Sequence, residues 1–174
     1  MKFGCLETGS NSERVAKKIV NPRDEIVSFR TMSDVLNSLL NGQTDYAVVP
    51  VENSITGEIP YKSEIKRLGL VKIGEGLIDI RHCLALKNKF IDIGFILSHP
   101  EALKQCRDYL RKFNSTAYIG KTGSTAEAAR IIAGIESTNG AAIADYQTCE
   151  DYGLVVRDAN IVRNNKSLFW IVKK

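Results

Sequence analysis

The stretch that decides the fold reads YAVVPVENSITGE and covers Tyr46–Glu58. Its apolar run Ala47–Val51 predicts a strand that is buried on both faces, as strands of parallel sheets are. Pro50 and Gly57 are expected to mark the points where regular structure stops. The chain is therefore expected to be an α/β protein in which this strand belongs to a parallel sheet.

Three polar side chains follow the apolar run: the carboxylate of Glu52, the amide of Asn53 and the hydroxyl of Ser54. Open α/β sheets bind their ligands at the carboxyl ends of strands, so this position predicts a ligand site. The same side chains could instead satisfy backbone groups of an ordinary turn. The segment alone leaves both interpretations open.

The composition is that of an ordinary globular protein. The 174 residues include 44% hydrophobic and 25% charged residues, which excludes a disordered or collagen-like chain. This length is enough for one core or for two small lobes. The net charge of +4 is scattered along the chain and favours a small anionic substrate over nucleic acid.

The four cysteines, Cys5, Cys83, Cys106 and Cys149, have no Cys-x-x-Cys spacing and lie in apolar or amphipathic segments. They are interpreted as small reduced hydrophobic residues, with no metal site and no disulfide expected. No apolar run approaches the roughly 18 residues of a membrane span, so no membrane partner is expected. The expected location is cytoplasmic.

Strands and helices alternate in the first part of the chain. Ser12 is the expected N-cap of the first helix, which ends before Pro22, and Thr31 or Ser33 is the expected N-cap of the second, which Gly42 closes. The predicted strands cover residues 2–5, 25–29, 47–51 and 71–80, and a third helix covers 59–68.

A second α/β unit follows. Ser98-His99-Pro100 is expected to open one helix, and Ser124 or Thr125 another. The predicted strands cover 82–86, 93–97, 117–119 and 141–144, while 154–156 and 168–172 return the chain to the first unit. Alternating strands and helices favour parallel strands with crossover helices. Residues 1–78 plus 158–174 are thus expected to form lobe 1, and residues 79–157 lobe 2.

Two α/β lobes joined by two crossings leave a cleft, where small ligands usually bind. Helix starts that point into such a cleft supply donors for anions. The hydroxyl-bearing helix starts are Ser10 to Ser12, Ser98, and Ser124 with Thr125.

Four segments together resemble the catalytic domain of prephenate dehydratase, and the resemblance covers residues 9–172. They are YAVVPVENSITGE from Tyr46, ILSHPEALKQCRDYL from Ile96, GSTAEAARII from Gly123 and AAIADYQTCEDYGLVV from Ala141. The resemblance implies two lobes like those of type II periplasmic binding proteins, a cleft between them, and a homodimer or larger assembly. The chain stops at Lys174, so the phenylalanine-binding C-terminal regulatory domain of most members is expected to be absent.

The resemblance also implies the site residues. Ser167 is the implied proton donor, Asn53, Ser54 and His99 are the other implied catalytic residues, and Glu52 braces the loop. The implied substrate-binding residues are Ser10, Ser12, Ser98, Gln105, Ser124, Thr125 and Phe169. A helix-cap or core role suits His99 equally well, and His82, inside an apolar strand, is interpreted as structural.

The chain departs from the family pattern at two places. Leu6-Glu7 stands where the family has Gly-Pro, and Ser167-Leu168-Phe169 stands where it has Thr-Arg-Phe. The hydroxyl is kept, but the guanidinium that helps to hold a substrate carboxylate is lost. Arg163 and Lys166 are nearby in sequence and could supply a replacement charge.

Three functions follow from this pattern. The favoured one is a prephenate dehydratase, a hydro-lyase that forms phenylpyruvate, CO2 and water from prephenate without a cofactor. The alternative is a non-aromatising prephenate decarboxylase, a branch of the family that lacks Thr-Arg-Phe. The second alternative is a catalytically inactive module of the same fold that binds small anions.

Overall fold

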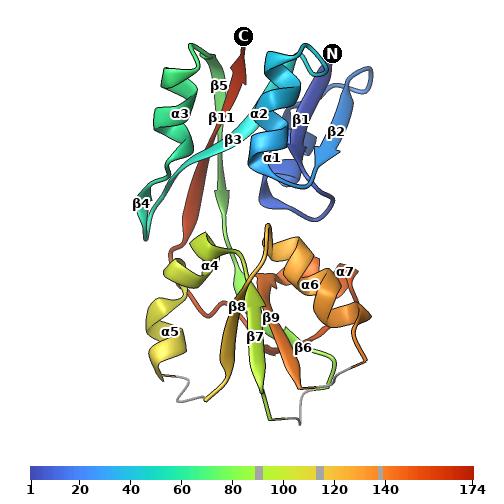
Figure 1. The fold of residues 1–174 in the computed structure, drawn as a ribbon, viewed down its shortest axis with the longest axis vertical. Helices are drawn as coiled ribbons and strands as arrows, with labels where there is room; N and C mark the ends of the chain where they lie inside the picture. Colours follow the sequence, from blue (N-terminus) through green and yellow to red (C-terminus); the bar gives the residue numbers. More distant parts are fainter. Residues whose placement is uncertain (89–91, 113–115, 137–138) are drawn as a thin grey trace. The chain divides into compact units, whose positions relative to one another are not determined.

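The chain forms two compact α/β units. The computed structural model describes residues 1–88, 92–112, 116–136 and 139–174 (Figure 1). The first unit contains Met1–Asp79 and Lys166–Lys174, and the second contains Ile80–Asn165. The chain passes between the units twice, as expected from the sequence.

The first unit is built on a mixed sheet with the strand order β2-β1-β3-β11-β5, and β4 pairs with β3. β1 runs parallel to β2 and β3, whereas β11 runs antiparallel to β3 and β5. The elements are β1 (Lys2–Leu6), α1 (Asn11–Ile19), β2 (Glu25–Phe29), α2 (Met32–Leu40), β3 (Tyr46–Asn53), β4 (Gly57–Glu58), α3 (Tyr61–Arg67), β5 (Val71–Asp79) and β11 (Lys166–Lys173).

Apolar side chains of α2 and α3 pack on the central strands of this sheet. Leu36 and Ile65 join Val49 and Val51 in one buried cluster, with Trp170 partly buried against it. α1 packs against β5 at Gly76, where an added Cβ would lie 2.8 Å from Cγ1 of Val15. Helices therefore cover the strand pair β3–β11 that carries the motif residues.

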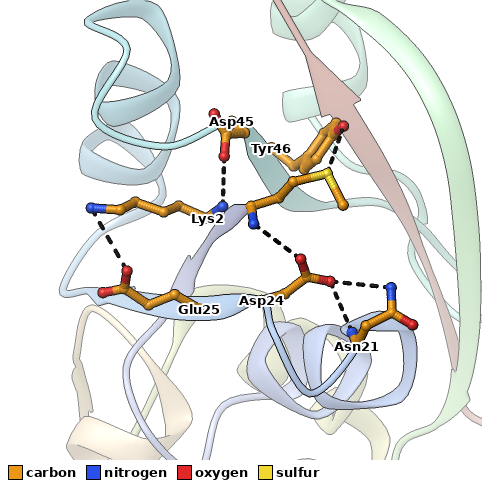
Figure 2. Close-up of polar contacts among 7 residues, drawn as sticks. Lys2, Asn21, Asp24, Glu25, Asp45 and Tyr46 are labelled. Carbon is orange, nitrogen blue, oxygen red and sulfur yellow. Dashed lines mark hydrogen bonds and ion pairs between the residues drawn. The ribbon is translucent and has the colours of Figure 1, made fainter.

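The amino-terminal strand is held between its two neighbours by polar contacts (Figure 2). The backbone N–H of Lys2 donates to the carboxylate of Asp45 at 2.7 Å, and its ammonium lies 3.7 Å from the carboxylate of Glu25. Asp24 accepts from the backbone N–H of Asn21 at 2.9 Å. These contacts join the starts of β1, β2 and β3 at one edge of the unit.

The second unit is built on a mixed sheet with the order β10-β6-β9-β7-β8. β7 runs parallel to β8 and β9, and β6 runs antiparallel to β9 and β10. The elements are β6 (His82–Leu86), β7 (Phe95–Ser98), α4 (Pro100–Gln105), α5 (Arg107–Lys112), β8 (Tyr118–Lys121), α6 (Thr125–Gly134), β9 (Gly140–Asp145), α7 (Tyr146–Asp151) and β10 (Val155–Asp158).

Both faces of the second sheet are buried, and β9 shows this most clearly. Ala142 and Ala144 pack in a cluster with Ile132 of α6, whereas Ile143 packs in another cluster with Cys106, next to α4. Alternate residues of the strand thus face opposite helix layers. All six residues of β9 are buried, as expected of a central strand.

Three structural expectations need correction. The sheets are mixed rather than all parallel, because β11 returns antiparallel beside β3 and β6 lies antiparallel to β9. Pro50 does not end its strand but lies within β3, opposite Phe169 and next to a register shift, where a proline is tolerated. The first helix is capped by Ser10 rather than Ser12.

The second passage between the units lies at residue 165 rather than 157. β10 pairs with β6 of the second sheet, and Ile161 and Val162 pack against the second unit's core. The backbone N–H of Ile80 donates to the carbonyl of Asn165 at 2.8 Å, so the first and last residues of the second unit are hydrogen-bonded to each other. The four cysteines are free and buried.

Candidate active site

A hydrogen bond joins the side chains of the motif residues Asn53 and Ser167. They are cross-strand partners on β3 and β11 and are 2% and 5% exposed. The Asn53 amide Nδ2 donates to Oγ of Ser167 at 2.9 Å and to the carbonyl of Lys166 at 3.0 Å. The structure therefore brings together two residues that lie 114 positions apart in the sequence.

The orientation of the Asn53 amide follows from its other contacts. Its Oδ1 accepts from the backbone N–H groups of Ile55 at 2.9 Å and Thr56 at 3.2 Å. Because two backbone donors face the oxygen, the nitrogen must face Ser167. Oγ of Ser167 is thus an acceptor in this bond, and its own hydrogen is directed elsewhere. In the described part of the chain, that hydrogen has no acceptor.

Ser54, the residue after Asn53, forms two hydrogen bonds with the backbone of Lys166. Its N–H donates to the carbonyl of Lys166, and its Oγ accepts from the N–H of Lys166, both at 2.9 Å. Glu52 is half exposed and lies 3.9 Å from the ammonium of Lys62. The two bonds of Ser54 thus tie the loop after Asn53 to the start of β11.

Leu168 occupies the position of the lost guanidinium. Its cross-strand partners are Glu52 on β3 and Leu77 on β5. The ammonium of Lys166 lies 3.8 Å from the carboxylate of Asp79. The next residue, Phe169, is 3% exposed and belongs to the buried core.

The first helix start uses its hydroxyls within its own loop. Ser10 caps α1 by accepting from the N–H of Glu13 at 3.2 Å and donates to the carbonyl of Leu6 at 3.1 Å. Ser12 accepts from the N–H of Leu6 at 2.9 Å and shares a 3.2 Å bond with Ser10. Both side chains are buried and stabilise the turn between β1 and α1.

Ser124 caps α6 in the same way as Ser10 caps α1, and the next residue, Thr125, also carries a hydroxyl. Ser124 accepts from the N–H of Glu127 at 2.8 Å, and the Glu127 carboxylate accepts from the N–H of Gly123. Thr125, the first helical residue, is partly buried, and its hydroxyl makes no hydrogen bond within the described residues. Thr125 therefore has the more available hydroxyl of this pair.

Ser98 and His99 both have local structural contacts. The Ser98 hydroxyl is fully buried and donates to the carbonyl of Ile143 at 2.7 Å. Nδ1 of His99 accepts from the N–H of Glu101 at 3.1 Å and so caps α4. Burial lowers the pKa of His99 below its ordinary value, and the nearby Glu101 carboxylate partly opposes this shift. His99 is thus neutral near pH 7.

Gln105 belongs to a buried cluster that the sequence did not reveal. Its Oε1 lies 2.7 Å from Nε2 of His82 and accepts from Nδ2 of Asn165 at 2.8 Å. His82 was interpreted as structural, which its burial supports, but Asn165 carried no sequence signal beyond its polarity. The three residues come from β6, the end of α4 and the last position of the second unit.

In the described residues, no group of three His, Cys, Asp or Glu side chains could hold a metal ion. The thiols are equally unsuited to chemistry, since burial raises the pKa of Cys5, Cys106 and Cys149 to about 12. No helix in the described part of the chain is long and apolar enough to cross a membrane. What the site does offer is hydroxyl and amide groups in defined hydrogen bonds.

A family comparison matches residues 7–174 to the model described as prephenate dehydratase. The chain belongs to the prephenate dehydratase family. The prephenate dehydratase of Methanocaldococcus jannaschii is 34% identical over 178 aligned positions, which cover 97% of this chain and 63% of that protein. The chain spans between about a third and two thirds of the length of the curated prephenate dehydratases it matches.

Solved structures agree on the fold. A prephenate dehydratase from Arthrobacter aurescens in complex with L-Phe has a TM-score of 0.80 at 23% identity, covering 100% of this chain and 60% of that one. The methionine-binding protein MetQ has a TM-score of 0.58 at 15% identity, covering 100% and 82%. The expected likeness to periplasmic binding proteins is thus confirmed for the fold.

Proposed function

We propose that the chain is a prephenate dehydratase, a hydro-lyase that converts prephenate to phenylpyruvate, CO2 and water. The observation that carries the proposal is the bond from the Asn53 amide to Ser167 Oγ, in a family member that keeps this asparagine and a hydroxyl at position 167. This bond leaves the hydroxyl hydrogen of Ser167 available for a substrate oxygen. A positioned donor of this kind is what the leaving ring hydroxyl needs.

The reaction breaks two bonds of the substrate ring. Electrons of the bond to the ring carboxylate move into the ring as CO2 departs, and the carbon–oxygen bond of the hydroxyl breaks with its electron pair on oxygen. Ser167 gives its hydrogen to that oxygen, which leaves as water, and Ser167 recovers a proton from solvent. The Asn53 N–H stabilises the charge that develops on Oγ during this transfer.

Thr125 and His99 are proposed to bind and orient the substrate. Thr125 has an uncommitted hydroxyl beside the amino-terminal end of α6, where a carboxylate is electrostatically favoured. His99 is neutral near pH 7, so it would act by a hydrogen bond rather than by charge. Aromatisation supplies driving force, and the proposed mechanism needs no cofactor.

A product assay tests the proposal. The purified chain is incubated with prephenate, and the products are identified by mass spectrometry; phenylpyruvate and CO2 are expected. Ser167→Ala should lower kcat by about 100-fold with the fold intact, because the proton donor is lost. The matched control is Ser38→Ala, which removes another buried serine of the first unit, outside the site. Near-normal turnover by Ser167→Ala would remove Ser167 from its role.

A second candidate is the non-aromatising prephenate decarboxylase, which Leu168 in place of arginine favours. Its product retains the ring hydroxyl and is heavier than phenylpyruvate by one water, so the same mass measurement distinguishes it. Saturable thermal stabilisation by prephenate without turnover would instead indicate the inactive anion-binding module.

Leu168→Arg tests what the lost guanidinium means. The cross-strand position opposite Glu52 leaves the new side chain at the motif end of β11. If the dehydratase proposal holds, the apparent KM should fall about tenfold, because a charged hydrogen bond to a carboxylate contributes roughly 1.5–3 kcal/mol. The control is Leu168→Met, which keeps the size without charge. An unchanged KM would mean that another cation already serves.

The proposal extends to the protein's setting. Prephenate is its small-molecule partner, the cytoplasm is its location, and it forms a homodimer or larger assembly. Light scattering of the purified chain measures the last of these directly.

A further inference from the structure

The oxygen of Gln105 is the centre of a buried polar cluster, the Gln105 cluster, that contains His82, Gln105 and Asn165. It accepts from Nδ2 of Asn165 at 2.8 Å and lies 2.7 Å from Nε2 of His82, so both of its lone pairs are used. The three side chains are 2%, 9% and 3% exposed. The Gln105 oxygen therefore has no lone pair left to accept a hydrogen bond from a ligand.

The cluster lies at both points where the chain passes between the units. The second unit begins at Ile80, two residues before His82, and it ends at Asn165. The backbone N–H of Ile80 also donates to the carbonyl of Asn165 at 2.8 Å. Gln105 is the last residue of α4. Its contacts therefore connect α4 to the chain near both points where it passes between the units.

The outgoing passage leads directly to the proposed proton donor. Asn165 is followed by Lys166, whose N–H and carbonyl are both bonded to Ser54, and then by Ser167. The backbone that places Ser167 Oγ is thus fixed by Asn53 and Ser54 on one side and by Asn165 on the other. A shift at Asn165 has only one intervening residue in which to be absorbed before it reaches Ser167.

We propose that Gln105 and Asn165 are positioning residues that set the backbone path into Ser167, and that Gln105 does not contact the substrate. The inference rests on the proposed dehydratase function for its kinetic consequences. Misplacing a catalytic group by as little as about 1 Å can lower its rate contribution by about 100-fold. Loosening the cluster should therefore lower kcat more than it raises KM.

Asn165→Ala is the central variant, because it releases the passage while His82 still pairs with Gln105. We expect kcat to fall about tenfold and KM to stay within about twofold. Amide hydrogen exchange at residues 166–168 should accelerate. The matched control is Tyr109→Phe, which removes the 2.6 Å hydrogen bond to Asp158 elsewhere in the second unit and should leave all three quantities near those of the wild type.

Gln105→Glu separates positioning from substrate contact. A carboxylate accepts from both His82 and Asn165 and keeps the cluster, so kcat and KM should stay within about threefold of the wild type. If Gln105 contacted the dianionic substrate, the new charge would repel it and KM would rise strongly. Gln105→Leu removes the acceptor and should behave like Asn165→Ala.

Each result supports or overturns the inference. A kcat for Asn165→Ala equal to that of Tyr109→Phe overturns it, as does a KM that rises more in Gln105→Glu than in Gln105→Leu. If the wild-type chain shows no turnover, the proposed function fails, and hydrogen exchange alone decides the inference. Unchanged exchange at residues 166–168 in Asn165→Ala then overturns it, and accelerated exchange supports it.

Discussion

Each unit buries a polar cluster that includes a motif residue, Asn53 with Ser167 in the first unit and the Gln105 cluster in the second, and the two clusters differ in what they leave unpaired. In the first unit, Asn53 donates to Ser167, and the hydroxyl hydrogen of Ser167 has no acceptor in the described part of the chain. In the second unit, Nε2 of His82 must carry its hydrogen because it faces the oxygen of Gln105. Nδ1 of His82 is then a buried acceptor without a partner among the described residues.

This difference separates two uses of a buried polar group. A spare donor can be offered to a ligand oxygen and costs little when it reaches one. A spare buried acceptor weakens the fold and gains a proton only at the expense of a buried charge. The first cluster is suited to chemistry, whereas the second is suited to holding the backbone in place and to sensing acid.

The largest expected effect comes from breaking the first cluster at Asn53. Asn53→Leu removes the acceptor of the Ile55 and Thr56 backbone N–H groups and the donor to Ser167. We expect the free energy of unfolding to fall by about 3 kcal/mol, because the variant loses at least four hydrogen bonds, two of them to part-buried backbone N–H groups, and each typically contributes about 1 kcal/mol. Urea denaturation measures this.

Ser167→Ala is the control for Asn53→Leu, since it removes only the bond to Ser167. Its unfolding free energy should stay within about 1 kcal/mol of the wild type. A loss as large as that of Asn53→Leu would mean that the hydroxyl serves mainly the fold, and the contrast between the two clusters would disappear.

The free energy of unfolding should depend on pH through His82 of the Gln105 cluster. Burial lowers the pKa of His82 below its ordinary value of 6.5, although the bond to Gln105 and the charge of Asp145 oppose this. The folded state therefore binds this proton less readily than the unfolded chain. Stability is fully present above about pH 6.5 and should fall by up to about 1.4 kcal/mol per pH unit below it.

His99 shares this behaviour, because burial lowers its pKa too, so the two histidines must be separated. His99→Asn keeps a side-chain cap on α4 and should leave the slope from His82. His82→Leu should remove that slope and leave the one from His99. Unfolding free energies at pH 5, 6 and 7 measure both, and an unchanged slope in His82→Leu would contradict the assignment.

The periodicity of the sequence predicted most elements, because α1, α2 and α6 each have an apolar face and a side-chain N-cap. The strand at Glu25–Phe29 and the caps at Thr31 and Ser124 agree with the structure. Strand direction was not predictable, since β11 pairs with β3 and β5 from far along the chain. The short helix α7 was also missed, because its N-cap Asp145 ends a continuous apolar strand.

The candidate site was predictable only where the family motif marks it. The resemblance marks Asn53 and Ser167 as site residues, and the pairing of β3 with β11 brings them into contact. The role of Asn165 was not predictable, because a polar residue in a connector looks exposed until the fold places Gln105 beside it. The resemblance implies that Ser10 and Ser12 bind substrate, yet both hydroxyls bond within their own loop.

The smallest expected effect compares two copies of one local motif, Gly-Ser-x-x-Glu, at Gly9–Glu13 and Gly123–Glu127. In both, the serine accepts from the glutamate N–H, and the glutamate accepts from the glycine N–H. Removing either cap should cost about 1 kcal/mol. Ser10 also donates to the carbonyl of Leu6 and bonds Ser12.

Ser10→Ala should therefore lower the unfolding free energy by about 0.5–1 kcal/mol more than Ser124→Ala, since it also leaves a buried carbonyl and hydroxyl with one partner fewer. Urea denaturation of the two variants side by side measures the difference. Ser10→Thr and Ser124→Thr keep the capping oxygen and should each recover most of the loss. Equal losses for the two alanine variants would show that the additional bonds of Ser10 add nothing, and that the loop hydroxyls of the first unit are as available to a ligand as those of the second.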